Sequence, residues 1–344
     1  MGNYKQALQW FRKVKAPTLP RVYNEIAHTH LLLNNTDSAE YFLTLFHKAP
    51  VDGKAKPNSI YYGMHHLYDG EVLIKRKQYA AALPELQQAI IVLGGRFNNR
   101  DPFTNPENFT GTFLNFRLFD ALYKKAATFE TLYATQKKEA YLQAALDTYN
   151  SAISLLRYIE KSYDTDDAKL FLKNNNQQVC QQAVQVCLQL HALHPAAGYA
   201  QQAFVMAERN KASVMYSELA EKSFRKLPGI DPVLIQQERN IKYNIARVSI
   251  RGDRALDSAA AAALTSEKAS FEIQLAQVQH AIEQNSLYYK HKYSETYPRP
   301  DSIQKYLTRQ QAVISFYATV NTLQVFVITK NEVKQTHIDS FAVL

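Results

Sequence analysis

The chain has 344 residues, of which 46% are hydrophobic, so it can form a contiguous core. Its two cysteines argue against a disulfide framework, and the lack of an apolar run of about 18 residues or of a charged-then-apolar leader argues against a membrane span or a signal peptide. The 40 basic and 31 acidic residues leave a net charge of +9, which makes nucleic acid a conceivable partner. We therefore expect a cytoplasmic protein with no membrane association.

The first residues follow the pattern of the second half of a helical hairpin. Gly2 stands at a turn, and Tyr4, Ala7 and Phe11 follow at helical spacing. The first helix of this hairpin is missing before Gly2, so we expect the natural chain to be longer upstream. The next unit, Tyr23–Phe46, places apolar residues on two helices in the same phase, in a degenerate form of the pattern.

The clearest unit runs from Gly70 to Ile90. On its first helix the small Gly70 lets a neighbouring helix come close, and Leu73 follows on the same face, before Lys77 and Gln78 mark a turn. The second helix carries one apolar stripe, formed by Ala82, Leu83, Leu86 and Ala89. Order and spacing resemble the tetratricopeptide repeat, a helix-turn-helix unit of about 34 residues. Because one such unit cannot bury its apolar face, the resemblance implies a solenoid of stacked repeats.

Two segments interrupt the repeats. Val51–Ser59 is polar and lengthens the interval between Ala39 and Ala82. Gly94–Thr112 is rich in Gly, Pro and Asn, which predicts a long loop. We expect its aromatic residues to fold back onto the helices, and a binding role for them is the less favoured alternative; these residues are Phe97, Phe103 and Phe109.

Longer helices follow, and then strands. Apolar residues at helical spacing predict a third hairpin, Phe113–Thr135 with Tyr141–Ile159, and a fourth, Ala168–Leu193 with Ala196–Ala220. The same spacing predicts a long antiparallel helix pair, Pro232–Arg251 with Leu264–Tyr289. A short helix, Ile303–Leu307, precedes runs rich in β-branched and aromatic residues. These runs predict a β-meander of three strands, Ala312–Val320, Thr322–Thr329 and Val333–Ile338.

Three segments resemble bacterial proteins in which tetratricopeptide repeats precede a caspase-related peptidase domain of the CHAT type. Ala207–Ala212 (AERNKA) and Gln236–Arg239 (QQER) match the last repeat helix and the helix after it, and Leu323–Lys330 matches a strand at the entrance of the peptidase domain. The resemblance implies that the catalytic His and Cys come further downstream, and this chain has no counterpart of either. We therefore expect no catalytic residue, no cofactor and no cleavage by the chain itself.

Together these patterns predict a mainly α fold. We expect a TPR-like α-solenoid of helix hairpins over residues 1–228 and a long antiparallel helical hairpin over 229–297. The short C-terminal β-meander over 302–344 would be the first part of an incomplete α/β domain similar to the CHAT type.

Without catalysis, the function must lie on the surface of the stacked hairpins. In such solenoids the first helices line a concave groove that binds an extended or helical peptide. Helical phase places seven residues there: Asn24, His28, Leu67, Glu71, Lys75, Tyr123 and Glu130. A carboxylate clamp would need recurring Lys, Arg and Asn at these places, so Glu71 and Glu130 argue against one.

Other reactive side chains are better explained by packing or solvation. Cys180 and Cys187 are expected as small buried hydrophobic residues. His191 and His194 could bind a metal only with further ligands that the sequence does not show, and the adjacent pair His65 and His66 diverges on a helix. The sequence therefore predicts no metal site.

Two hypotheses of different class remain open, and a third is weaker. In the first, the chain is a scaffold, the regulatory or sensor arm of a protease whose catalytic part follows Leu344. In the second, it is a fragment or subunit of the cysteine peptidase itself. The third is nucleic-acid sensing, but the basic clusters Arg12–Lys15, Lys75–Lys77 and Lys124–Lys125 are more typical of solvated surfaces and are not interleaved with aromatic residues.

Overall fold

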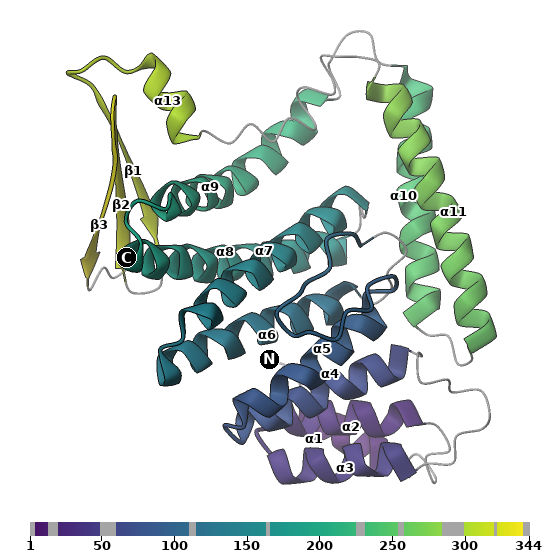
Figure 1. Cartoon of the computed structure of the whole chain (residues 1–344). Helices are drawn as coiled ribbons and strands as arrows, with labels where there is room; N and C mark the ends of the chain where they lie inside the picture. The colour runs from purple at the N-terminus through teal and green to yellow at the C-terminus, as the bar shows by residue number, and fades with distance from the viewer. Residues whose placement is uncertain are drawn as a thin grey trace. The chain divides into compact units, whose positions relative to one another are not determined.

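A computed structural model describes residues 4–12, 20–48, 60–109, 115–162, 166–224, 231–253, 258–283, 299–319 and 322–339. The chain is mainly helical, with a small antiparallel sheet near its C-terminal end (Figure 1). The helices are α1 (Tyr4–Arg12), α2 (Pro20–Leu32), α3 (Thr36–Lys48), α4 (Ile60–Lys75), α5 (Tyr79–Leu93), α6 (Asn115–Gln136), α7 (Glu139–Ser162), α8 (Asp166–Leu193), α9 (Tyr199–Phe224), α10 (Pro232–Asp253), α11 (Ser258–Glu283) and α13 (Pro300–Tyr306).

The chain forms two compact units. One comprises residues 1–168 with 240–275, and the other comprises 169–239 with 276–344. Helices α8 and α9, which the sequence pattern grouped with the solenoid, fall in the same unit as the strands. Parts of the expected pattern, including Gly2, Val51–Ser59 and Tyr289, lie outside the described residues.

Three helical hairpins follow one another in the first unit: α2 packs on α3, α4 on α5, and α6 on α7. Each pair is joined by a short turn that contains one residue in the left-handed conformation, namely Asn34, Lys77 and Lys137, with φ of 60°, 61° and 57°. In the first two turns a backbone N–H reaches back to the carbonyl five residues earlier, from Asn35 to His30 and from Gln78 to Leu73, both at 2.8 Å. This is the Schellman way of ending a helix, and it confirms the turn predicted at Lys77 and Gln78.

Small residues let α4 and α5 pack closely, as the sequence predicted for Gly70. A methyl group at Gly70 would lie 2.9 Å from side-chain carbons of Leu86, and one at Gly63 would lie 2.8 Å from those of Leu93. The predicted stripe of α5 is buried, with Ala82, Leu86 and Ala89 at 0% exposure and Leu83 at 6%. The interior of this hairpin therefore has the expected composition.

The described part of the predicted loop, residues 94–109, packs on the helices. Phe109 is buried, and Phe103 is half exposed but lies against Phe129 of α6, with ring centroids 5.1 Å apart. On α7, Ser151 Oγ donates a hydrogen bond of 2.7 Å to the backbone carbonyl of Pro106. The prediction that this loop folds back is confirmed for these residues.

The second unit contains α8, α9 and the sheet. Cys180 and Cys187 of α8 are free and buried, as predicted, and Cys187 Sγ lies 3.8 Å from Met206 Sδ of α9. The predicted start of α9 at Ala196 is wrong. The chain turns first through Gly198, whose φ of +82° is incompatible with a right-handed helix, and α9 begins at Tyr199.

The predicted meander is present, as β1 (Ala312–Ala318), β2 (Thr322–Thr329) and β3 (Val333–Asp339), antiparallel in the order β1-β2-β3. Phe326 of β2 is fully buried, with its ring 5.7 Å from that of Phe204 on α9. Strand β1 also presents apolar side chains to solvent, since Ile314 and Phe316 are 56% and 54% exposed.

Candidate binding face on helices α2, α4 and α6

Polar and aromatic side chains from the first helices of the three hairpins meet in one cluster. We call it the α2/α4/α6 face, and it consists of His28, Tyr68, Glu71, Arg117, Asp120 and Lys124. The imidazole of His28 on α2 stacks on the ring of Tyr68 on α4, with centroids 4.8 Å apart. The guanidinium of Arg117 on α6 lies over the same ring at 5.8 Å. One buried tyrosine ring therefore joins groups from three hairpins.

Two ion pairs extend the cluster. Lys124 Nζ of α6 lies 3.2 Å from the carboxylate of Glu71 on α4, and these side chains are 32% and 15% exposed. Arg117 lies 3.4 Å from Asp120 one turn further along α6, with exposures of 27% and 36%. All four groups are open to solvent in part, so a bound molecule could contact them.

Burial changes the protonation of this face. It lowers the pKa of His28 to about 4, with a further contribution from Arg117 and Lys124, so the imidazole is neutral at pH 7. Burial also raises the pKa of Asp120, which Arg117 opposes. The hydroxyl of Tyr68 is buried and has no hydrogen-bond partner among the residues that the structure describes. The face thus combines neutral, cationic and anionic groups within a small area.

Two of the seven predicted groove residues lie on this face, Glu71 and His28. For Asn24 and Leu67 the prediction of an open surface is wrong, because their exposures are 0% and 1%. The amide of Asn24 instead donates a hydrogen bond of 2.8 Å to the backbone carbonyl of Tyr61. Helix α4 contacts α2, α3, α5 and α6, so most of its circumference is buried and helical phase alone could not identify its exposed side.

The other three predicted residues are engaged elsewhere. Lys75, at the end of α4, donates a hydrogen bond of 3.0 Å to Asn34 Oδ1 in the α2–α3 turn. Glu130 accepts a hydrogen bond from the hydroxyl of Tyr149 on α7, and burial raises its pKa. The ring of Tyr123 lies 5.9 Å from that of Tyr149. These contacts tie neighbouring helices together.

Sequence reasoning missed Tyr68, Arg117 and Asp120 and considered Lys124 only as part of a basic cluster. A signal for the last three was present, since residues spaced by three and four share one face of a helix. Tyr68 carried no such signal, because an aromatic residue at a core position is expected to be buried for packing alone.

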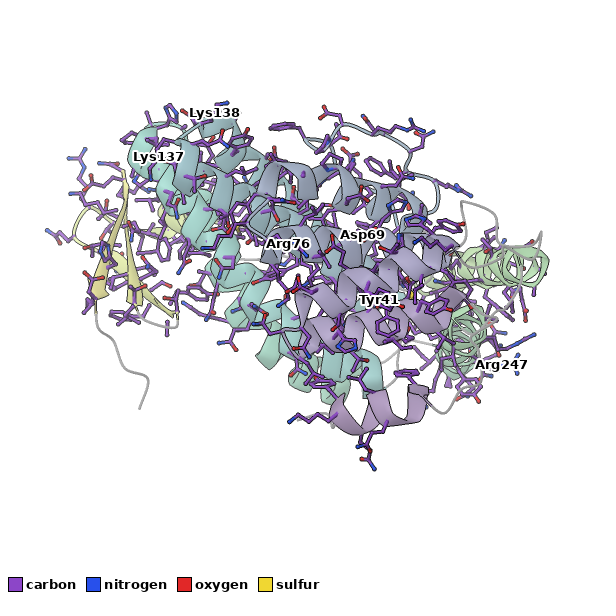
Figure 2. All side chains as sticks on the ribbon, turned by 90° about the horizontal axis from the view of Figure 1, so that it is seen from below. Tyr41, Asp69, Arg76, Lys137, Lys138 and Arg247 are labelled. Atoms are coloured by element: carbon purple, nitrogen blue, oxygen red, sulfur yellow. The ribbon has the colours of Figure 1, made fainter. Side chains whose placement is uncertain are left out.

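One group of potential metal ligands occurs within the described ranges, formed by His47, His65 and Asp69. It lies where the end of α3 meets α4. In Figure 2, Asp69 is labelled on α4, and Arg76 is labelled just beyond the end of that helix. Arg76 is occupied by ion pairs with Asp37 and Glu40 and takes no part in this group.

No protein-family profile, curated protein or solved structure matches this chain. In the part of the chain that the structure describes, no helix of sufficient length is apolar enough to span a bilayer.

Proposed function

We propose that this chain is a protein–protein interaction scaffold that binds a peptide segment of its partner on the α2/α4/α6 face. The observation that carries the proposal is the meeting of His28, Tyr68 and Arg117 from three successive hairpins in a partly exposed cluster. Tetratricopeptide-like solenoids use their first helices in this way. The left-handed residue repeated in the three turns supports the expected repeat arrangement.

The charges of the face indicate the chemistry of the partner. It carries two cations, Arg117 and Lys124, and the carboxylates of Asp120 and Glu71. Partly exposed ion pairs contribute about 0–1 kcal/mol, so a ligand could exchange them for its own charges at little cost. We therefore expect a peptide with both acidic and basic side chains, and with an apolar residue to cover the partly exposed ring of His28.

Selection from a random peptide library against the purified chain tests this proposal. Peptides that bind should lose at least about tenfold in affinity with Arg117→Ala, since arginine is enriched among the central residues that contribute most to binding. Lys334→Ala is the matched control, because Lys334 forms an exposed ion pair of 2.8 Å with Glu332 on the other unit. Failure to enrich any peptide, or equal affinity for both variants, would contradict the proposal.

We further propose that the scaffold serves as the regulatory or sensor arm of a CHAT-type, caspase-like protease. Two of the segments that resemble that class belong to one contact network. Within the AERNKA run, Lys211 Nζ donates a hydrogen bond of 2.6 Å to Ser315 Oγ on β1, and Asn210 donates one of 2.9 Å to the hydroxyl of Tyr317. Strand β1 in turn pairs with β2, which holds most of the Leu323–Lys330 segment. Such contacts between helix and sheet fit a regulatory region whose ligand binding changes the activity of an attached domain.

The coding sequence beyond Leu344 tests whether the chain is such an arm or a free-standing scaffold; the other alternative is a fragment or subunit of the peptidase itself. An in-frame continuation that contains further strands with a His and a Cys would support the regulatory arm. A stop codon directly after Leu344 would oppose it and would favour a free-standing chain.

Nucleic-acid sensing is a weaker alternative, because several basic residues of the two clusters that the structure describes in full are paired or buried. Lys124 pairs with Glu71, Arg76 with Asp37 and Glu40, and Lys125 is fully buried. A titration with single- and double-stranded nucleic acid at several salt concentrations tests it. A binding constant that falls steeply with salt would favour this alternative.

A further inference from the structure

Three atoms that could serve as metal ligands lie close together where the last turn of α3 meets α4. His65 Nε2 lies 2.7 Å from His47 Nε2 and 2.9 Å from Asp69 Oδ2. All three ligand atoms lie within 4.8 Å of one another. His47 and Asp69 are open to solvent at least in part, whereas His65 is fully buried.

Hydrogen bonding alone does not satisfy this arrangement well. A ring nitrogen carries either a proton or a lone pair, and a proton on His65 Nε2 points in one direction. It can therefore make a good hydrogen bond to Asp69 or to His47, but not to both. Three electron-pair donors within 4.8 Å of one another are an arrangement that a cation can satisfy.

The surrounding residues hold His65 in place for such a role. Its ring stacks on the buried ring of Phe46, with centroids 4.4 Å apart and an interplanar angle of 12°. Its other nitrogen, Nδ1, is buried without a hydrogen-bond partner among the described residues, so the orientation of the ring depends on this stacking and not on an outer-shell hydrogen bond. The ring of His47 meets it edge-on at 4.3 Å.

We propose that His47, His65 and Asp69 bind a divalent transition-metal ion. Two imidazoles and one carboxylate suit Zn²⁺ best, with a fourth position for water. Tetrahedral bonds of about 2.0–2.1 Å to Zn²⁺ place two ligand nitrogens about 3.3 Å apart, so His47 must move outward by roughly half an ångström. Its exposed position in the last turn of α3 permits that movement.

A metal ion at this place would cross-link the second helix of one hairpin to the first helix of the next. The ion would join α3 to α4, which residues 49–59 connect along the chain. Binding to the folded state alone raises the temperature of unfolding. The inference does not depend on the peptide-binding proposal, because none of its ligands belongs to the α2/α4/α6 face.

Metal titration of the full chain tests this inference. The protein is stripped with a chelator, desalted, and titrated with Zn²⁺ by calorimetry and with Co²⁺ by visible absorption. The variants are His47→Ala, which changes an exposed side chain, and Asp69→Asn, which keeps the shape of the carboxylate. The matched control is His337→Ala, because His337 forms another His–Asp pair, at 3.6 Å to Asp339, on an exposed strand.

We expect one Zn²⁺ per chain, tetrahedral Co²⁺ bands and an unfolding temperature that rises with Zn²⁺, in the natural chain and in His337→Ala alike. His47→Ala should weaken binding at least about tenfold, since a direct ligand contributes no less than the outer-shell groups that cost 10–100-fold. Absence of binding, or binding that His47→Ala leaves unchanged, would overturn the inference. If Asp69→Asn fails to fold, His47→Ala alone decides between these outcomes.

Discussion

Lys124 and Lys125 are neighbours on α6, yet they lie in regions with opposite roles. Lys124 belongs to the α2/α4/α6 face and pairs with Glu71 while 32% exposed. Lys125 is fully buried and donates hydrogen bonds of 2.7 Å to Gln87 Oε1 and 2.8 Å to the backbone carbonyl of Thr104. One lysine is available to a ligand, whereas the other fastens the 94–109 loop to α5 and α6. The side of the helix, and not the residue type, sets the role.

The largest effect expected from this comparison is on stability. Lys125→Ala leaves a cavity and deprives one buried and one partly buried acceptor of their donor, and it should lower the free energy of unfolding by about 3 kcal/mol. Chemical denaturation measures this loss. Limited proteolysis should also cut the 94–109 loop faster in the variant, and an unchanged unfolding midpoint would contradict the structural role of Lys125.

A second prediction concerns pH. Burial lowers the pKa of Lys125 from 10.5 to about 7, which Asp101 partly opposes. Between these two values the unfolded chain binds the proton and the folded chain does not, so stability rises with pH. The free energy of unfolding should increase by about 2 kcal/mol between pH 7 and pH 9.

Lys125→Met provides the control for this pH dependence. The variant removes the titrating amine but keeps most of the side-chain volume. Urea denaturation at both pH values should therefore show a smaller increase for Lys125→Met than for the natural chain. Equal increases would assign the pH dependence to other groups.

The smallest effect on stability is expected on the exposed side of α6. Lys124→Ala removes one partly exposed ion pair and should change the free energy of unfolding by no more than about 1 kcal/mol. The same variant should weaken any peptide selected on the α2/α4/α6 face. A large loss of stability together with unchanged peptide affinity would reverse the roles assigned to the two lysines.

The sequence predicted those features that depend on local pattern. Gly70 and the α5 stripe were identified because small and large residues at helical spacing show which side of a helix packs closely. The turn at Lys77 and Gln78 and the three strands are local features in the same sense. The Gly-, Pro- and Asn-rich composition likewise identified the 94–109 loop.

Features that depend on several helices at once were not predictable. Asn24 of α2 and Leu67 of α4 were placed on an open groove because phase along one helix does not show which of its sides the neighbouring helices cover. His47 and His65 are 18 residues apart, and only tertiary packing brings their nitrogens together. The burial of Lys125 depends on the path of the loop, which composition does not determine.

Photo-cross-linking tests the central claim most directly. A benzophenone amino acid is introduced in place of Asp120 on the α2/α4/α6 face and, separately, in place of Phe316 on β1, which is 54% exposed. A peptide selected on the natural chain should cross-link at position 120 and not at position 316. Cross-linking at position 316 alone, with none at position 120, would contradict the claim that this chain binds its partner through the first helices of its hairpins.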